Sequence, residues 1–234
     1  MRIPSWLRSN EAPLRAEAQR REYRAIAARI TADRPARVLD WGCGLGQVAD
    51  LLVRAGLNVD AFDYGGDQAP NALTELPHFP NLSAYVSSDP VELPYSDGAF
   101  AAVLSCGVLE HVQDPHASLE EIKRVLMPGG TLYVYKLPNE RSYLEWIARK
   151  IGLDYHGQHP YDRLYTLTSA QALLVQHGYR ISEAGYANML PLTLSGRVAN
   201  RLGGLIWSAS GLLSAVPGLR QFATNVETVA RSPA

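Results

Sequence analysis

Short apolar runs alternate with amphipathic stretches through the middle of the chain. The runs predict strands at 37–41, 58–63, 82–86, 100–105 and 131–135, and the stretches predict helices at 46–55, 67–76 and 118–126. The last of these helices is expected to stop at the Pro-Gly-Gly run 128–130. Such alternation is typical of βαβ units, which build a parallel sheet with helices on both faces. The sequence therefore predicts an α/β fold that binds its ligands at the carboxyl ends of the strands.

Further elements are expected on either side of this region. An Ala/Arg/Glu-rich stretch at 12–30 predicts a helix. Later in the chain we expect helices near 140–150, 169–177 and 197–216, and strands near 179–187 and 222–230. Thr168 is expected to cap the helix that begins at Ser169. We therefore divide the chain into an N-terminal helical segment, 1–35, and one domain, 36–234.

Composition and charge narrow the class of protein. The 234 residues are 47% hydrophobic and 19% charged, which is ordinary for a globular protein. The net charge of -1 hides an acidic middle third, because residues 38–121 hold one Arg against thirteen acids. Together with the lack of a basic, aromatic-interleaved stretch, this argues against nucleic acid as a partner and favours a neutral or cationic ligand.

The cysteines and the N-terminal residues bear on the compartment. Cys43 and Cys106 fit neither a disulfide framework nor a zinc-binding spacing. The first ten residues carry two arginines and no apolar run, so no secretory signal is expected. These features predict a cytoplasmic protein, acting as a monomer or homodimer.

A glycine-rich loop follows the first predicted strand and opens the next helix. Its glycines, Gly42, Gly44 and Gly46, are spaced G-x-G-x-G, whereas a dinucleotide fingerprint would place its third glycine at Gln47. Asp40 lies just ahead of the loop. Its carboxylate beside a pyrophosphate would cost about 4 kcal/mol at 4 Å, whereas beside an amino group or a sulfonium it would be favourable. The loop therefore argues against a nicotinamide-dependent oxidoreductase.

Asp63 ends the second predicted strand, about 20 residues after the glycine loop. A carboxylate at this place can accept hydrogen bonds from both hydroxyls of a ribose. The alternative is that Asp63 only caps the helix expected at 67–76. Asp60 alternates with Asp63 along the strand and is expected to point away from the site.

Several motifs in this order resemble those of class I S-adenosylmethionine-dependent methyltransferases. They are the loop 38–46, Asp63, the stretch 88–95, the Leu-Glu-His-Val run 109–112 and the Leu-Met-Pro-Gly-Gly run 126–130. Together they are far more specific than any one motif. The resemblance implies a Rossmann-like methyltransferase fold, with a doubly wound, mostly parallel seven-stranded sheet, and S-adenosyl-L-methionine as cofactor.

The resemblance also implies roles for individual residues. Asp40 would lie near the amino end of the cofactor, Asp63 would bind the ribose and Asp89 the adenine amino group. The residues implied to line the cofactor site are Asp40, Gly42, Cys43, Gly44, Gly46, Asp63, Tyr64, Asp89, Pro90, Val91, Ser105 and Cys106. Pro90 departs from the family pattern because it has no N–H to offer the adenine ring.

His111 is the candidate catalytic residue. Its unperturbed pKa, near 6.5, suits a general base; the alternative is a structural histidine that bonds a nearby loop. Ubiquinone-pathway O-methyltransferases have a similar Leu-Glu-His-Val segment, with a metal-binding acid three residues before the Glu. That position is Gly107 here, so no metal is expected.

The acceptor side is expected at 140–178 and 196–218. The polar run 155–166 supplies His156, His159, Arg163 and Tyr165 as candidate substrate-binding residues. In the helix at 197–216 the aliphatic residues follow i, i+3, i+4, i+7 spacing. That apolar face should be buried against the protein itself or a second subunit; the alternatives are a lid over an apolar acceptor, or peripheral membrane contact through 197–218.

The sequence thus predicts methyl transfer from S-adenosyl-L-methionine to a small-molecule or lipid-linked acceptor, with oxygen as the expected methyl-accepting atom, in a biosynthetic pathway. Oxygen is favoured because the Asn/Asp-Pro-Pro-Tyr type of run that amino-group methyltransferases often carry is absent. Two alternatives stay open. One is a C-methyltransferase, and the other is a cofactor-binding accessory protein without turnover.

Overall fold

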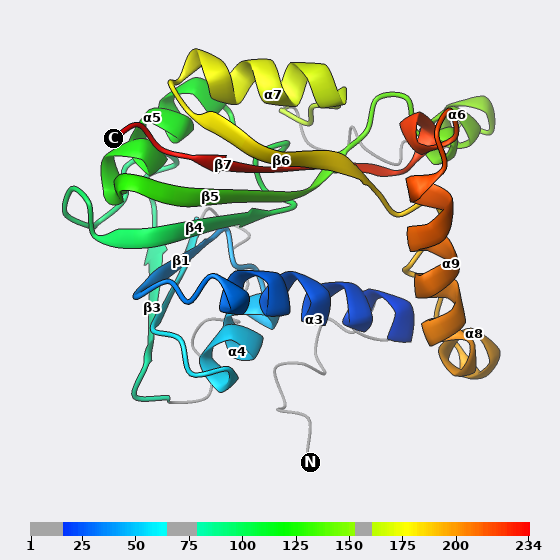
Figure 1. Ribbon diagram of the computed structural model, residues 1–234, viewed down its shortest axis with the longest axis horizontal. Helices are drawn as coiled ribbons and strands as arrows, with labels where there is room; N and C mark the ends of the chain where they lie inside the picture. Colours follow the sequence, from blue (N-terminus) through cyan, green and yellow to red (C-terminus); the bar gives the residue numbers. More distant parts are fainter. Residues whose placement is uncertain (1–15, 65–78, 153–160) are drawn as a thin grey trace. The chain divides into compact units, whose positions relative to one another are not determined.

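The computed structural model describes residues 16–64, 79–152 and 161–234. Within them the strand order is β3-β2-β1-β4-β5-β7-β6 in a seven-stranded sheet (Figure 1). The strand order runs outward in both directions from β1 and β4, as in a doubly wound α/β fold. The predicted fold class is therefore confirmed. The chain divides into two compact units, Met1–Asp89 with Leu192–Ser208 and Pro90–Pro191 with Ala209–Ala234.

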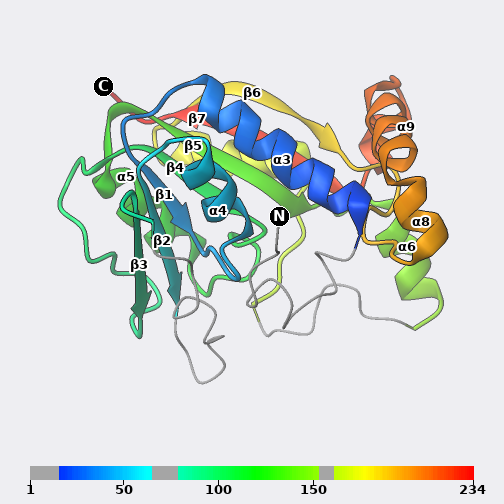
Figure 2. The same cartoon turned by 90° about the horizontal axis from the view of Figure 1, so that it is seen from below.

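The first unit contains a three-stranded parallel sheet. Its strands are β1 (Val38–Trp41), β2 (Val59–Tyr64) and β3 (Leu82–Ser87), and Val59 lies opposite both Val38 and Leu82. Helix α3 (Glu17–Ala32) contacts α4 (Gln47–Arg54), and α4 contacts β2 (Figure 2). All four residues of β1 are buried, as expected for a strand covered on both faces. The three parallel strands bring their carboxyl ends to one edge.

The second unit joins a parallel pair to an antiparallel pair. Strand β4 (Phe100–Cys106) is parallel to β5 (Leu126–Pro138), while β7 (Asn225–Arg231) is antiparallel to both β5 and β6 (Arg180–Ala187). Helix α5 (Pro115–Val125) contacts β5, and α7 (Leu167–Gln176) lies over β6 and β7 (Figure 1). Helix α6 (Tyr143–Lys150) and the 3-10 helix η2 (Arg220–Phe222) complete the unit.

The predicted boundary between the helix at 118–126 and the strand at 131–135 is wrong. Helix α5 starts at Pro115, because Asp114 accepts hydrogen bonds from the N–H groups of His116 and Ala117. It ends at Val125, and β5 begins at once with Leu126. The pairing with β4 then shifts register between Phe100 and Ala102, so the Pro-Gly-Gly run forms an irregularity within the strand.

The predicted cap of the following helix is also wrong. Helix α7 is capped by Thr166 and not by Thr168. The Thr166 hydroxyl accepts from the Ser169 N–H at 3.0 Å, and the Ser169 hydroxyl accepts from the Thr166 N–H at 2.9 Å. This reciprocal pair satisfies two backbone donors that a cap at Thr168 would leave open.

The helix predicted at 197–216 is two helices, α8 (Arg197–Arg201) and α9 (Gly203–Ala215). Much of the aliphatic face is not buried against the protein itself, since Leu205 is 67% and Leu212 is 73% exposed; its burial against a second subunit stays a prediction. Ser210 and Ser214 are buried instead. Their hydroxyls accept from the N–H groups of Leu190 and Met189, both at 3.0 Å, which explains why this polar side of α9 faces inward.

The helix predicted at 67–76 lies outside the described residues. Over 16–64, 79–152 and 161–234, every helix falls short of the length and hydropathy that a bilayer-crossing helix needs.

Candidate functional site

The glycine loop of the first unit is fixed to the end of β2. The N–H groups of Gly42 and Cys43 both donate to the carbonyl of Phe62, at 2.8 and 2.9 Å. Gly42, Gly44 and Gly46 have φ of 71°, 54° and 71°, in the left-handed region that glycine adopts without strain. A Cβ built on Gly44 would meet no atom within 4 Å, so the loop turns bare backbone toward open space.

Asp63 binds this loop directly. Its carboxylate accepts from the Gly44 N–H at 2.6 Å and from the Tyr64 N–H at 2.7 Å. Partial burial raises the pKa of Asp63, and the two hydrogen bonds oppose that rise. A carboxylate offers about four acceptor positions, so two remain for a ligand. The structure thus positions Asp63 to join the loop to a group with paired hydroxyls.

Asp40 is buried beneath the same loop, at 2% exposure. One oxygen accepts from the Ala49 N–H at 3.1 Å, in the first turn of α4. Burial raises the pKa of Asp40 to about 7, and the nearby charge of Asp63 adds to the rise. Burial likewise raises the pKa of the Cys43 thiol. In this structure Asp40 therefore stabilises the loop by binding the first turn of α4, which follows the loop.

Asp60 points away from the loop, as predicted from its alternation with Asp63. Both of its oxygens accept from the Arg37 guanidinium at 2.8 Å. The Asp60 side chain is buried and Arg37 is partly exposed, so the pair stabilises the structure at a distance from the glycine loop.

The third predicted cofactor segment straddles the two units. Asp89 is exposed, and its N–H donates to the Ser87 hydroxyl at 3.0 Å, just beyond β3. Pro90 and Val91 begin the second unit. Contacts of all three with adenine stay a prediction, as do those of the exposed Tyr64.

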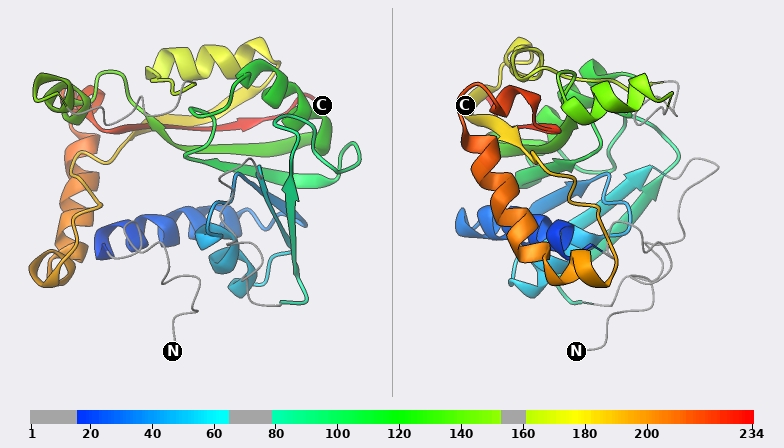
Figure 3. Two further views of the ribbon diagram at one scale, coloured as in Figure 1. Left: turned by 180° about the vertical axis from the view of Figure 1, so that it is seen from behind. Right: turned by 90° about the vertical axis from the view of Figure 1, so that its right-hand side faces the viewer.

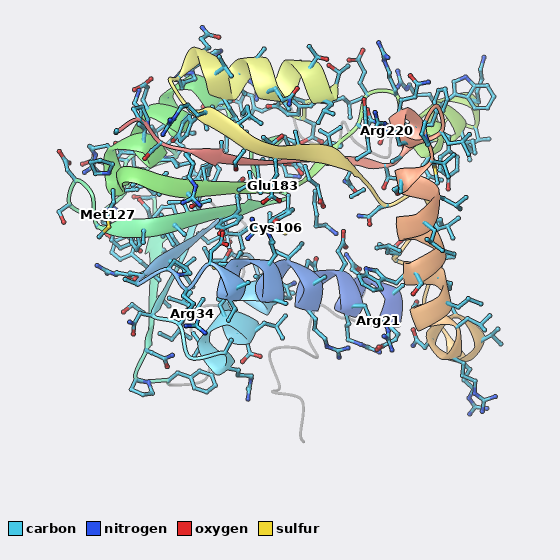
Figure 4. All side chains as sticks on the ribbon, in the orientation of Figure 1. Arg21, Arg34, Cys106, Met127, Glu183 and Arg220 are labelled. Carbon is cyan, nitrogen blue, oxygen red and sulfur yellow. The ribbon has the colours of Figure 1, made fainter. Side chains whose placement is uncertain are left out.

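Ser105 and Cys106 end β4 in the second unit, and Figure 4 shows Cys106 at the end of β4 away from Met127 of β5. The Ser105 hydroxyl is buried, and it has no hydrogen-bond partner among the described residues. Unpartnered buried hydroxyls are uncommon in folded proteins. The end of β4 therefore holds a polar group that internal packing does not use.

His111 lies just after this strand, in a turn. Its Nδ1 is 2.7 Å from Oδ1 of Asp162, whose side chain is 5% exposed. An ionised carboxylate can only accept, so Nδ1 carries the hydrogen and Nε2 is the basic nitrogen. Sequence reasoning missed Asp162 as the partner of His111, because 51 residues separate the two and no local pattern links them.

Glu110 adds a second acid beside the imidazole. It is 4% exposed, with Oε1 3.7 Å from His111 Nε2. Burial raises the pKa of Glu110 to about 7, while the positive charges of His111 and Lys136 lower it. Its Oε2 is buried and has no hydrogen-bond partner within the described chain. A carboxyl group whose pKa lies near neutral pH can accept or donate a proton.

Two of the predicted substrate-binding residues hold the loop that carries His111. The Arg163 guanidinium donates to the carbonyls of Val112, Tyr161 and Gln113. Tyr165 is buried and donates to the Leu109 carbonyl at 3.4 Å, and burial raises its pKa to about 12. Both residues shape the acceptor side through the backbone, and direct substrate contact stays a prediction. His156 and His159 lie outside the described residues.

No group of three His, Cys, Asp or Glu side chains suited to a metal ion occurs in 16–64, 79–152 and 161–234. Asp40, Asp63 and His111 instead hydrogen-bond to protein groups. Their arrangement suits hydroxyl recognition at Asp63 and proton transfer at His111.

Comparison with known proteins connects these features to a family. Residues 39–134 match the model of a methyltransferase domain. The ubiquinone biosynthesis O-methyltransferase of Xanthomonas campestris is 33% identical over 136 residues, which cover 56% of this chain and 54% of that protein. The chain thus spans about half the length of the curated relatives it matches.

Solved structures agree on the fold. A Haloferax volcanii chain, solved in complex with the Trm112 methyltransferase activator, has a TM-score of 0.64 at 20% identity and covers 98% of this chain and 95% of its own length. A SAM-dependent methyltransferase from Methanosarcina mazei has a TM-score of 0.57 at 16% identity, covering 84% and 92% of the two chains. At 16–20% sequence identity, these similarities concern the fold alone.

Proposed function

We propose that this chain, in which residues 39–134 match a methyltransferase domain, is a class I methyltransferase that transfers a methyl group from S-adenosyl-L-methionine to an oxygen of a small-molecule or lipid-linked acceptor. The observation that carries the proposal is the Asp63 carboxylate bound to the Gly44 N–H, which joins the glycine loop to the end of β2. The similarity to a ubiquinone biosynthesis O-methyltransferase supports oxygen as the acceptor atom.

The residues of the first unit fit this cofactor. The open space at Gly44 lets a ligand approach the backbone, and Asp63 has two acceptor positions left for the ribose hydroxyls. Asp40 holds the loop through the first turn of α4. When bound, S-adenosyl-L-methionine would supply an activated methyl group on a sulfonium, which needs no further leaving-group chemistry.

The residues of the second unit fit the acceptor step. Nε2 of His111 takes the proton from the acceptor hydroxyl as oxygen becomes the nucleophile, and Asp162 holds the imidazole in the required tautomer. The Arg163 guanidinium holds the backbone just after His111 through the carbonyls of Val112 and Gln113, and it also bonds the carbonyl of Tyr161. Methyl transfer depends mainly on alignment, so this rigid support contributes as much as the base itself.

The first test is calorimetric titration of the purified chain with S-adenosyl-L-methionine, S-adenosylhomocysteine and NADH. We expect the first two to bind and NADH to give no heat. Binding of NADH alone would overturn the cofactor assignment. Binding of the first two, followed by no methyl transfer to any hydroxyl or carbon acceptor in a broad panel, would instead favour an accessory protein without turnover.

The second test concerns the dyad. His111→Gln should lower kcat for O-methylation about a hundredfold or more, with cofactor affinity unchanged, because a general base contributes to the chemical step. Asp162→Asn should lower kcat and leave KM nearly unchanged. His116→Gln is the matched control, since His116 bonds to His177 at 2.9 Å and not to the His111 loop. Equal activity of all three variants would remove His111 and Asp162 from the reaction.

A further inference from the structure

A cavity of about 550 Å³ lies in the second unit between α6 and η2. Among its lining residues are three cations and two aromatic side chains, which we call the basic–aromatic patch: Arg141, Trp146, Arg149, Lys150 and Phe222. Figure 3 shows α6 and η2 at the same end of this unit, and Figure 4 labels Arg220 on η2 beside them. The methyl-transfer residues described above do not line this cavity.

The aromatic part of the patch is turned to solvent. Trp146 is 62% exposed and Phe222 is 43% exposed, and Ile151 after α6 is 65% exposed. Exposed aromatic and aliphatic side chains of this size are costly in water unless something covers them. A tryptophan with its apolar ring and its N–H donor suits the boundary between water and hydrocarbon.

The cationic part of the patch lacks acidic partners. No ion pair of Arg141, Arg149 or Lys150 occurs in the part of the chain that the structure describes. Arg149 donates only to the carbonyls of Glu145 and Glu140, both at 3.4 Å, and Lys150 lies 5.9 Å from the centre of the Trp146 ring. Glu140 also lines the cavity, whereas the Glu145 side chain is buried at 3% exposure. The patch therefore carries a net positive charge.

The surroundings of the patch extend its apolar character. Leu212 and Val216 at the end of α9 and Leu219 before η2 are exposed, at 39% or more, in the same unit. Their neighbours Ser210 and Ser214 fix α9 through hydrogen bonds to backbone N–H groups, so the aliphatic side is held outward. Exposed aliphatic side chains thus lie on the segment of chain that leads into η2.

We propose that the basic–aromatic patch binds the surface of an anionic phospholipid bilayer. The cations would pair with lipid phosphates, and Trp146 and Phe222 would enter the headgroup region. A soluble phosphate alone would leave the aromatic and aliphatic side chains uncovered. The inference goes beyond the proposed function, because it requires neither cofactor nor acceptor.

Sedimentation with lipid vesicles tests the proposal. The full chain should bind vesicles of mixed phosphatidylcholine and phosphatidylglycerol and sediment poorly with phosphatidylcholine alone. A basic residue near an anionic surface contributes about fivefold to binding, so Arg149→Gln with Lys150→Gln should weaken it about thirtyfold. Trp146→Ser should also weaken it. The matched control, Arg197→Gln with Arg201→Gln on α8, removes the same charge from exposed positions and should bind as the unaltered chain does.

The outcomes separate the alternatives. Equal loss in the control variant would mean general electrostatic attraction, and would overturn the assignment to the patch. Binding abolished by inorganic phosphate at matched ionic strength would identify a soluble anion as the ligand, and would also overturn it. Unaltered binding in the Arg149/Lys150 and Trp146 variants would do the same. Circular dichroism melting curves confirm that each variant folds, since every substituted side chain is on the surface.

Discussion

Replacing Asp63 tests how the glycine loop and the ribose site depend on one carboxylate. Each oxygen of Asp63 accepts a backbone N–H, from Gly44 at 2.6 Å and from Tyr64 at 2.7 Å. In Asp63→Asn one oxygen becomes an NH2 group, so whichever way the amide turns, one backbone N–H faces another donor. The near-isosteric variant therefore loses a loop contact as well as charge-assisted bonds to the ribose.

The magnitude follows from the bonds that are lost. A hydrogen bond to a charged group contributes about 1.5–3 kcal/mol, which is a factor of about ten to a hundred in affinity. Asp63→Ala should weaken S-adenosyl-L-methionine binding by this factor, through loss of the ribose anchor. Asp63→Asn should weaken it at least as much, because the amide both loses the charge and sets a donor against the loop. Calorimetric titration of the two variants gives both affinities.

Asp60→Asn is the matched control for this pair. Asp60 is two residues away on the same strand, and it binds only Arg37 among the contacts described. This variant should lower the melting temperature and leave cofactor affinity unchanged. If Asp63→Asn bound the cofactor as tightly as the unaltered chain, the reasoning from both the loop contact and the ribose anchor would be refuted.

Two further predictions concern stability. Burial raises the pKa of Glu110 to about 7 in the folded chain, whereas its ordinary value is 4.5. Between these two pH values the unfolded chain ionises Glu110 more readily than the folded chain does, so the free energy of unfolding falls as the pH rises from 4.5 toward 7. Glu110→Gln should match the unaltered chain near pH 4 and exceed its stability by up to about 3 kcal/mol at pH 8; urea unfolding at both pH values checks this, and a difference that does not grow with pH would contradict it. Gly130→Ala would place a Cβ 2.8 Å from the Met127 carbonyl and 3.2 Å from that of Ala101, so it should cost about 1–3 kcal/mol, measured by the same unfolding curves; a neutral effect would show that the bulge can relax.

The strands could be predicted because their signal is local. A buried parallel strand needs a short apolar run, and β1, β2 and β4 each carry one between turn residues. The glycine loop and Asp63 could be predicted for a related reason, since their spacing along the chain decides how a strand end meets a helix start. The cap at Thr166 was also within reach, because Thr166 and Ser169 have capping-box spacing.

Other features depend on contacts that the sequence does not display. Helix α8 ends near Gly203, where a Cβ would come within 2.6 Å of Glu17 Cβ on α3, so a neighbouring helix requires the glycine. The inward side of α9 is set by backbone N–H groups of Met189 and Leu190, which favour two serines over the leucines. Asp162 reaches His111 across 51 residues. In each case a distant segment decides the outcome.

The end of β4 is where stability and function separate most clearly. The Ser105 hydroxyl and one oxygen of Glu110 are buried without hydrogen-bond partners among the described residues, as are polar atoms of Gln19, Ser118 and Thr228, and each such group costs about 1–3 kcal/mol. Ser105 lies at the end of β4 and Glu110 lies shortly after it. His111, with its partner Asp162, comes immediately after Glu110. Groups of this kind are retained where a ligand supplies the missing partners or a proton has to move. What distinguishes the end of β4 is that two such groups lie beside the His111–Asp162 pair, and this combination supports acceptor chemistry there separately from the family match.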